Sequence, residues 1–198
     1  MFRSISRRVT AIHYQPIRTY SIASHLAVSQ KKNTSDCTRA SIATIVNNIR
    51  KQPVANITSV NNSLLANCET MREKGIDGLQ PAMETKASHS IFNAFGLRSI
   101  NIEYSPEKLS NIEIAKQLIP TLKVGMYLCT CQPPGNSENV SHSVVLVDIT
   151  INASTQAIEY HIFDPYPRPD RNEKGIRILN ATALLKEKMT TNVFISKI

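Results

Sequence analysis

The sequence predicts an α+β domain in which N-terminal helices pack against a later antiparallel sheet. Apolar residues recur at helical spacing through most of the first half of the chain, whereas the part after residue 120 divides into short β-rich runs separated by turn residues. With 198 residues, of which 41% are apolar and 19% charged, the chain is long and apolar enough for one domain with a buried core. Its longest apolar runs are strand-sized, so no membrane span is expected.

The first helix is predicted over residues 37–50, because small and branched apolar residues recur there on one face. Asp36 or Ser35 can cap its start, and Pro53 follows its end. Three further helices are predicted from apolar spacing and from glycine, proline or serine at their ends. They cover residues 59–73, 80–95 and 106–118, with Gly75, Pro81, Gly96, Ser105 and Pro106 as the end signals.

Six β-runs complete the predicted fold. One alternates in polarity between the third and fourth helices, and the others follow the fourth helix. They cover residues 99–105, 124–132, 142–151, 157–165, 175–179 and 192–198. The stretch 151–159 is predicted to form a hairpin turn, and a short helix over 180–189 is expected before the last run.

Residues 1–24 are expected to lie outside the domain, which we place at residues 25–198. The stretch up to Asp36 holds six basic residues and one acid, so it carries +5 of the net charge of +8. A basic, Ser-rich start is typical of a mitochondrial targeting peptide, and equally of the N-terminus of a bacterial protein that stays in the cytoplasm or is delivered into a host. No cluster of Lys and Arg with interleaved aromatic residues indicates a nucleic-acid surface, so no nucleic-acid partner is expected.

Four cysteines, Cys37, Cys68, Cys129 and Cys131, are expected to be reduced in an intracellular protein. The chain is too long to depend on disulfides, and no secretory signal is recognised at its start. One residue separates Cys129 from Cys131, whereas metal and redox motifs usually have two. We therefore expect these two thiols to fill the core, and we expect neither a metal nor a cofactor.

Three residues suited to nucleophilic catalysis each stand at the end of a predicted element. Cys37 opens the first helix, where the partial positive charge and free N–H groups of a helix N-terminus favour a thiolate. His142 opens one β-run and Asp164 closes the next, so neighbouring antiparallel strands would bring them to the same end of the sheet. A thiol nucleophile, an imidazole base and an orienting carboxylate form a catalytic triad.

Each of these residues also has a structural explanation, as a core cysteine, a polar strand end and an Asp-Pro turn. Other residues suit the roles less well. His161 is an alternative base but lies in the middle of a β-run, and His89 lies within a helix. Asp148 stands six residues from His142 in the same run, about 20 Å away at the usual strand rise, which is too far to orient the ring.

The segments around these residues resemble the papain-like cysteine peptidases that process bacteriocin leaders at a double-glycine motif, and their stand-alone relatives. The similar features are "DC" at a helix start, "HSVVLV" at a strand start, "DP" at the end of the following strand, and "NAFGL" before a strand. They span about residues 28–170. The resemblance implies a papain-like fold, cleavage of a peptide or related amide bond in a peptide or protein substrate through a thioester, and no metal.

Carried over residue by residue, the resemblance implies that Cys37 is the nucleophile, His142 the base, Asp164 the orienting acid and Gln30 the amide of the oxyanion hole. Two positions depart from the family pattern. Gln30 stands about one residue further before the cysteine than usual, and Thr38 occupies a position that is normally glycine, where it is expected to crowd the cleft. Two alternatives therefore stay open beside a peptidase: a deamidase or acyltransferase with the same triad, and a degenerate papain-like domain that only binds peptides.

Overall fold

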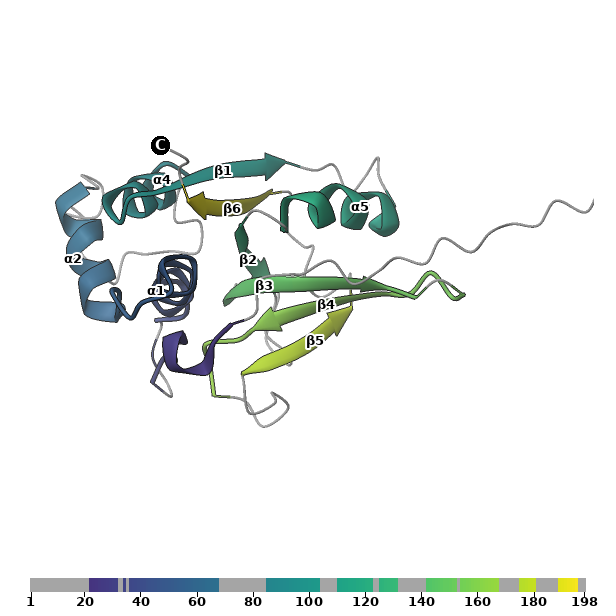
Figure 1. Cartoon of the computed structure of the whole chain (residues 1–198), viewed down its shortest axis with the longest axis horizontal. Helices are drawn as coiled ribbons and strands as arrows, with labels where there is room; N and C mark the ends of the chain where they lie inside the picture. The colour runs from purple at the N-terminus through teal and green to yellow at the C-terminus, as the bar shows by residue number, and fades with distance from the viewer. Residues whose placement is uncertain are drawn as a thin grey trace, which may run out of the picture.

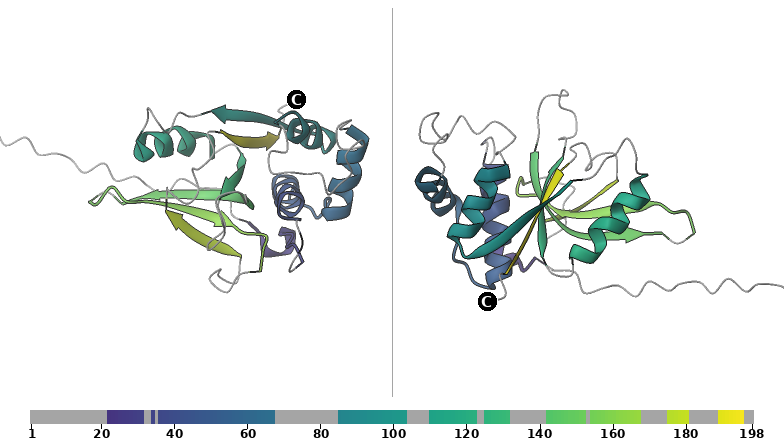
Figure 2. Two further views of the ribbon diagram at one scale, coloured as in Figure 1. Left: turned by 180° about the vertical axis from the view of Figure 1, so that it is seen from behind. Right: turned by 90° about the horizontal axis from the view of Figure 1, so that it is seen from above.

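A computed structural model describes residues 22–31, 34, 36–67, 85–103, 110–122, 125–131, 142–152, 154–167, 175–180 and 189–195. In this part of the chain, three helices lie together on one side of a six-stranded sheet (Figure 1). They are α1 (Cys37–Arg50), α2 (Ile57–Asn67) and α4 (Thr85–Ala94). A further helix, α5 (Asn111–Leu122), lies on the opposite side of the sheet (Figure 2).

Helix α1 is the central helix of the fold and has the predicted bounds. Residues 39–49 are all buried, so the helix is enclosed on nearly every side between the other helices and the sheet. Lys51 caps the C-terminal end of the helix and adopts a left-handed conformation with φ +56°. Exposed Arg50 donates hydrogen bonds to the carbonyl groups of Phe95 and Gly96, so the end of α1 is tied to the end of α4.

The other helices are shifted from their predicted starts because different residues cap them. Helix α2 begins at Ile57, two residues early, since the side chains of Asn56 and Ser59 each accept the other's backbone N–H. The prediction that Ser105 caps the fourth helix is wrong: α5 begins after Ser110. There Glu113 accepts both the backbone N–H and the hydroxyl of Ser110, which makes a capping box.

Some predicted ends fall outside the described residues. These are the end of the second helix at 68–73 and its Gly75 stop, the start of the third helix at 80–84 with Pro81, and most of the short helix at 180–189. At the end of α4, Gly96 is confirmed as the terminating glycine. Its φ is +67°, and an added Cβ would collide with the Arg50 guanidinium.

All strand pairs in the described sheet are antiparallel, as predicted. Their order is β1-β6-β2-β3-β4-β5, and each lies within three residues of a predicted β-run at both ends. The strands are β1 (Leu97–Glu103), β2 (Met126–Cys131), β3 (His142–Ile151), β4 (Ile158–Phe163), β5 (Ile176–Asn180) and β6 (Met189–Ile195). The predicted hairpin joins β3 to β4, with Ile151 opposite Ile158.

Alternation along the strands divides the buried apolar side chains into two cores. Residues such as Leu128 and Val145 face α1, α2 and α4 in the first core. Their neighbours Cys129 and Val144 face α5 in the second. Because both faces of β2 and β3 are covered, these strands are apolar on both sides. The first residue of β3 and the end of β4 then lie next to the start of α1.

The packed part of the chain begins earlier than the predicted boundary at residue 25. Ile22 is only 5% exposed and belongs to the first core. The next residue, Ala23, donates its backbone N–H to the side chain of Asn48 in α1. A short 3-10 helix, η1 (Ser24–Leu26), follows, and Leu26 is also buried. These residues carry no helical or strand periodicity of their own, so no local pattern in the sequence marks their packing.

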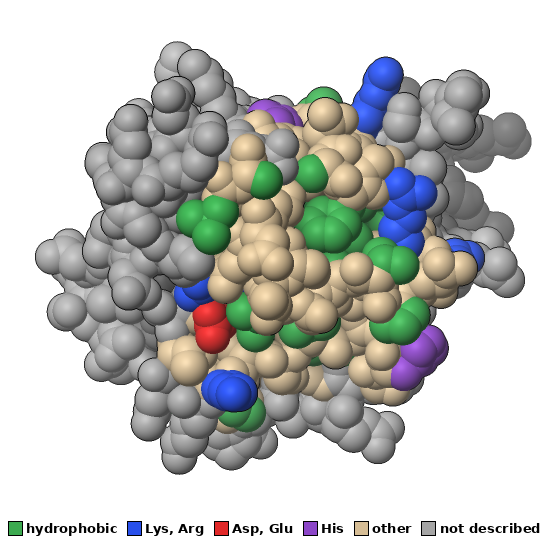
Figure 3. All heavy atoms as spheres, turned by 90° about the vertical axis from the view of Figure 1, so that its left-hand side faces the viewer, with side chains coloured by type: hydrophobic (Ala, Val, Ile, Leu, Met, Phe, Trp, Pro, Cys, Tyr) green, Lys and Arg blue, Asp and Glu red, His purple; other side chains and the backbone are tan. Residues whose placement is uncertain are grey.

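The described surface over α1, α2 and α4 is largely polar, with small separate hydrophobic groups (Figure 3). Single exposed apolar side chains of this kind are ordinary on a folded domain. Within the described residues, no helix is long and apolar enough to cross a membrane.

Candidate active site

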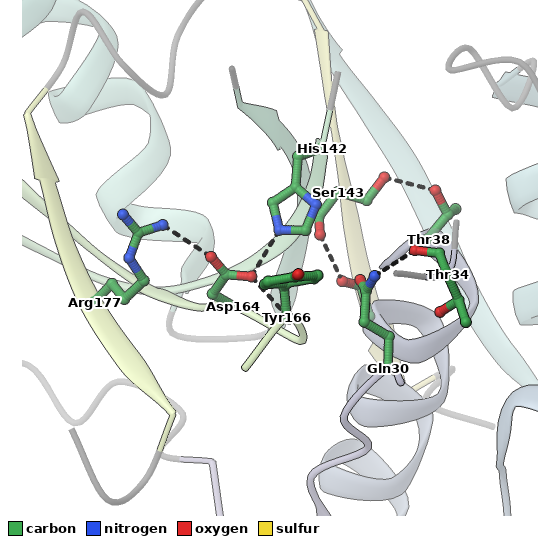
Figure 4. Close-up of polar contacts among 9 residues, drawn as sticks. Gln30, Thr34, Thr38, His142, Ser143, Asp164, Tyr166 and Arg177 are labelled. Carbon is green, nitrogen blue, oxygen red and sulfur yellow. Dashed lines mark hydrogen bonds and ion pairs between the residues drawn. The ribbon is translucent and has the colours of Figure 1, made fainter. Parts of the chain in front are cut away.

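The predicted triad residues lie at one edge of the sheet, beside the start of α1. Cys37 is the first residue of α1, His142 the first residue of β3, and Asp164 directly follows β4. The Cys37 thiol lies near the side chain of His142, and the ring lowers the pKa of the thiol. On the other side of the ring, Nε2 of His142 lies 2.6 Å from Oδ1 of Asp164 (Figure 4). Because Nε2 faces the carboxylate, Nδ1 is the ring nitrogen left for the sulfur.

The three groups shift one another's pKa values. Burial alone favours the neutral imidazole, but the hydrogen bonds and charges of Asp164 and Cys37 outweigh it and raise the pKa of His142 from 6.5 to about 9. Burial likewise opposes ionisation of Asp164, yet hydrogen bonds and the charge of His142 lower the pKa of its carboxyl from 3.8 to about 2. The ring and the carboxylate are therefore both charged at neutral pH.

The pKa of the Cys37 thiol is lowered as well. Burial raises it, but the hydrogen bond with His142, a hydrogen bond from the backbone of Ser143 and the charge of the ring more than compensate. A lowered thiol pKa next to a protonated imidazole favours the thiolate–imidazolium pair, which is the reactive form of a nucleophilic cysteine. The free thiol is partly exposed, so it is open to a reagent.

Asp36 occupies the N-cap position of α1, but the prediction that its side chain caps the helix is wrong. Its carboxylate instead forms an ion pair with Arg39, at 2.6 Å. Arg39 is itself buried and also donates to Asn61 of α2. The first N–H groups of a helix have no partner within the helix, and the carboxylate of Asp36 leaves them free to face a group beside Cys37. The alternative cap, Ser35, lies outside the described residues.

Thr38 makes contacts that the sequence did not indicate. Its hydroxyl lies 2.7 Å from the hydroxyl of Ser143 in β3 (Figure 4), and it helps to lower the pKa of the neighbouring Cys37 thiol. Ser41, one turn further along α1, donates to the backbone carbonyl of Ser143. The residue that replaces glycine after the cysteine thus joins α1 to β3.

Gln30 lies at the same edge of the sheet, next to the end of β4. Its backbone N–H donates to the carbonyl of Pro165, directly after Asp164, at 3.0 Å. The side chain is buried, with Nε2 donating to the carbonyl of Thr34 at 2.7 Å and Oε1 without a partner among the described residues. Since an amide nitrogen carries two hydrogens, one N–H of Gln30 remains for a further acceptor.

One charged residue of the site was missed by sequence reasoning. Arg177 in β5 is 5% exposed, and its Nη1 lies 2.8 Å from Oδ2 of Asp164. The only signal in the sequence is a single arginine inside the apolar run "GIRIL", in the strand that follows the Asp-Pro pair. A charged residue in an otherwise apolar strand indicates a buried partner, but the pattern does not say which carboxylate it is.

The alternative residues make other contacts. His161, the second candidate base, hydrogen-bonds Thr150 at 3.1 Å. His89 is half-buried and hydrogen-bonds Ser99. Asp148 accepts the N–H of Ile149. Among the described residues, no three His, Cys, Asp or Glu side chains gather as they would around a metal ion.

Of the other three cysteines, Cys129 is buried in the second core, as predicted. Cys131 lies in β2, but its side chain is outside the described part, and so is the whole of Cys68.

Three solved structures have a similar fold, each with a TM-score of 0.50. The first is a double glycine motif protease from an AMS/PCAT transporter, solved with a leader peptide; it is 15% identical, and the match covers 92% of this chain and 99% of that one. The second is the peptidase domain of Streptococcus ComA, a bi-functional ABC transporter of a quorum-sensing pathway, with 11% identity over 87% of this chain and 100% of that one. The third is UfSP from C. elegans, with 13% identity over 85% of this chain and 32% of that one.

No family model matches the sequence, and no curated protein matches it. Identities this low show the fold alone. The predicted papain-like α+β fold, and the predicted resemblance to double-glycine peptidase domains, are confirmed at that level.

Proposed function

We propose that this protein is a cysteine peptidase that cleaves amide bonds in peptides or proteins through a thioester on Cys37. His142 would act as base and acid, Asp164 would orient the ring, and Gln30 would take part in the oxyanion hole. One observation carries the proposal: His142 is hydrogen-bonded to the buried carboxylate of Asp164 and lies beside Cys37 at the start of α1, whose thiol pKa it lowers.

The chemistry follows from the positions of these groups. The Cys37 thiolate attacks the carbonyl carbon of the amide, and the negative charge moves to the carbonyl oxygen. N–H groups at the start of α1 and the remaining N–H of Gln30 would stabilise that oxyanion. His142 gives its proton to the leaving amine, the C–N bond breaks, and a thioester remains. Water then loses a proton to His142, attacks the thioester and releases the acid and the thiolate.

A peptide substrate is the simplest choice because one structural neighbour was solved with a leader peptide bound. Deamidation and acyl transfer pass through the same thioester and differ only in the leaving group or in the nucleophile that resolves it. The lowered pKa of Cys37 favours an enzyme over a domain that only binds peptides, because binding alone does not require an ionised thiol.

The test uses the full-length protein and a peptide carrying an electrophilic ketone. We expect stoichiometric labelling of Cys37 near neutral pH, loss of labelling in Cys37→Ala, a sharp decrease in His142→Ala and normal labelling in Cys68→Ala. Incubation with a peptide library, read by mass spectrometry, should reveal new termini that Cys37→Ala does not produce. Released ammonia would identify a deamidase, and products joined to an added amine would identify an acyltransferase. Absence of labelling between pH 6 and 9 would contradict the proposal.

A further inference from the structure

The carboxylate of Asp164 is held from two sides. Oδ1 faces Nε2 of His142 at 2.6 Å, and Oδ2 accepts Nη1 of Arg177 at 2.8 Å (Figure 4). Asp164 is fully buried, and the two cations are 6% and 5% exposed. The guanidinium donates to the carboxylate of Asp164. Arg177 therefore contacts Asp164, which in turn contacts His142, the residue beside the sulfur.

The strand register fixes where Arg177 can reach. It pairs with Ile162 in the β4–β5 ladder, and beyond the last pair the N–H of Asp164 donates to the carbonyl of Gly175 at 3.2 Å. Gly175 adopts φ +75°, a conformation that glycine tolerates best. The start of β5 thus holds both the backbone and the side chain of Asp164.

We infer that Arg177 is a positioning residue of the proposed active site: its guanidinium fixes the Asp164 carboxylate in the orientation that hydrogen-bonds His142. This inference rests on the proposed function. The site is then a row of four groups whose charges alternate, from thiolate to imidazolium to carboxylate to guanidinium. Asp164 is polarised at both oxygens, and rotation of its carboxylate would break two charge-assisted hydrogen bonds at once.

Two effects of Arg177 on the ring have opposite signs, which makes the inference testable. As a positive charge alone, the guanidinium disfavours protonation of His142. As an anchor for Asp164, it preserves the hydrogen bond that favours protonation. Among the described titratable side chains, Cys37 from α1 and Asp164 from the end of β4 face the ring. Its strand partner Cys131 in β2 has no described side chain.

Two alkylating agents measure the charge on the ring without a substrate. Iodoacetate is an anion and is attracted by an imidazolium, whereas iodoacetamide is neutral. The ratio of their rate constants at Cys37, measured on full-length protein by peptide mass spectrometry, falls as the ring loses its proton. The pH at the midpoint of that fall reports the pKa of His142, and Arg177 does not titrate in this range.

In the unmodified protein the midpoint is expected near pH 9. In Arg177→Met it should fall by at least one pH unit. The midpoint of Arg177→Lys should lie between those of the unmodified protein and Arg177→Met, because an ammonium keeps the charge but not the geometry of the guanidinium. Arg98→Met, an exposed arginine on β1, is the matched control and should keep the original midpoint.

A midpoint that stays or rises in folded Arg177→Met would overturn the inference, because Arg177 would then act only through packing or charge. If Arg177→Met does not unfold cooperatively, Arg177→Lys decides: a midpoint lowered by half a unit supports positioning, and an unchanged midpoint contradicts it. If the proposed function itself is wrong, the ratio of the iodoacetate to the iodoacetamide rate constant in the unmodified protein should show no fall between pH 6 and 10.

Discussion

Asp164→Asn is the substitution that tests the candidate site most directly. Asparagine keeps the shape of the side chain but removes the charge that both His142 and Arg177 contact. One side of the amide carries N–H donors, so it cannot accept from both partners. Because Asp164 is fully buried, water does not readily replace the lost interactions.

The size of the effect follows from the pKa of His142, which rises from 6.5 to about 9 in the folded protein. At 1.36 kcal/mol per unit, this shift amounts to about 3 kcal/mol in favour of the imidazolium. Asp164 provides the largest contribution that raises this pKa, and burial of the ring lowers it. In Asp164→Asn we therefore expect the pKa of His142 to fall by at least one unit, which moves the midpoint of the iodoacetate-to-iodoacetamide rate ratio down by the same amount.

The assay is the pH profile of Cys37 alkylation by iodoacetate and iodoacetamide, with urea unfolding measured at each pH. Arg177 is left buried without its counter-charge, so the free energy of unfolding should fall by about 3–5 kcal/mol. If the variant does not fold, the imidazole resonances of His142 in the unmodified protein still test for a pKa near 9. A variant that folds and keeps its midpoint near pH 9 would refute the reasoning.

Three further predictions concern acid stability, the hydroxyl next to the thiol, and the end of α4. Because the pKa of Asp164 is lower in the folded state, its contribution of about 2 kcal/mol to stability is complete above pH 3.8 and is lost as the pH falls through 2. Urea unfolding of the unmodified protein should show this loss, and Asp164→Asn should lack it. Thr38→Val should raise the pKa of Cys37, seen as a shift of the acid limb of alkylation to higher pH, whereas Thr38→Ser should leave it unchanged. Gly96→Ala should lower the unfolding free energy by about 1–3 kcal/mol, because the position has φ +67°; an unchanged thermal midpoint would contradict this.

Much of the candidate site could be predicted because its residues stand at element ends, which local patterns mark. The bounds of α1 follow from apolar spacing, so Cys37 was correctly placed at a helix start. The start of β3 and the end of β4 are also marked by local patterns, an apolar run after His142 and an Asp-Pro pair at 164–165. A short hairpin then forces neighbouring antiparallel strands, and this brings His142 and Asp164 to one edge.

The parts that were missed depend on contacts between remote segments. Arg177 meets Asp164 only through the β4–β5 register, and no local pattern pairs a given arginine with a given carboxylate. The predictions of the helix caps were wrong for a related reason. Both Ser105 and Ser110 suit a helix start, and the choice depended on Glu113 three residues after the second serine. Ile22 joined the core through tertiary packing alone.

The misjudged cap at Asp36 also bears on the proposed chemistry. An aspartate that caps a helix stabilises it, typically by about 1 kcal/mol, by accepting its first N–H groups. Here Arg39 holds that carboxylate at 2.6 Å, and Arg39 is held in turn by Asn61 of α2. The arrangement neutralises a negative charge that would raise the pKa of the adjacent Cys37 thiol. It also leaves the first N–H groups of α1 without a capping carboxylate, as the proposed oxyanion hole requires.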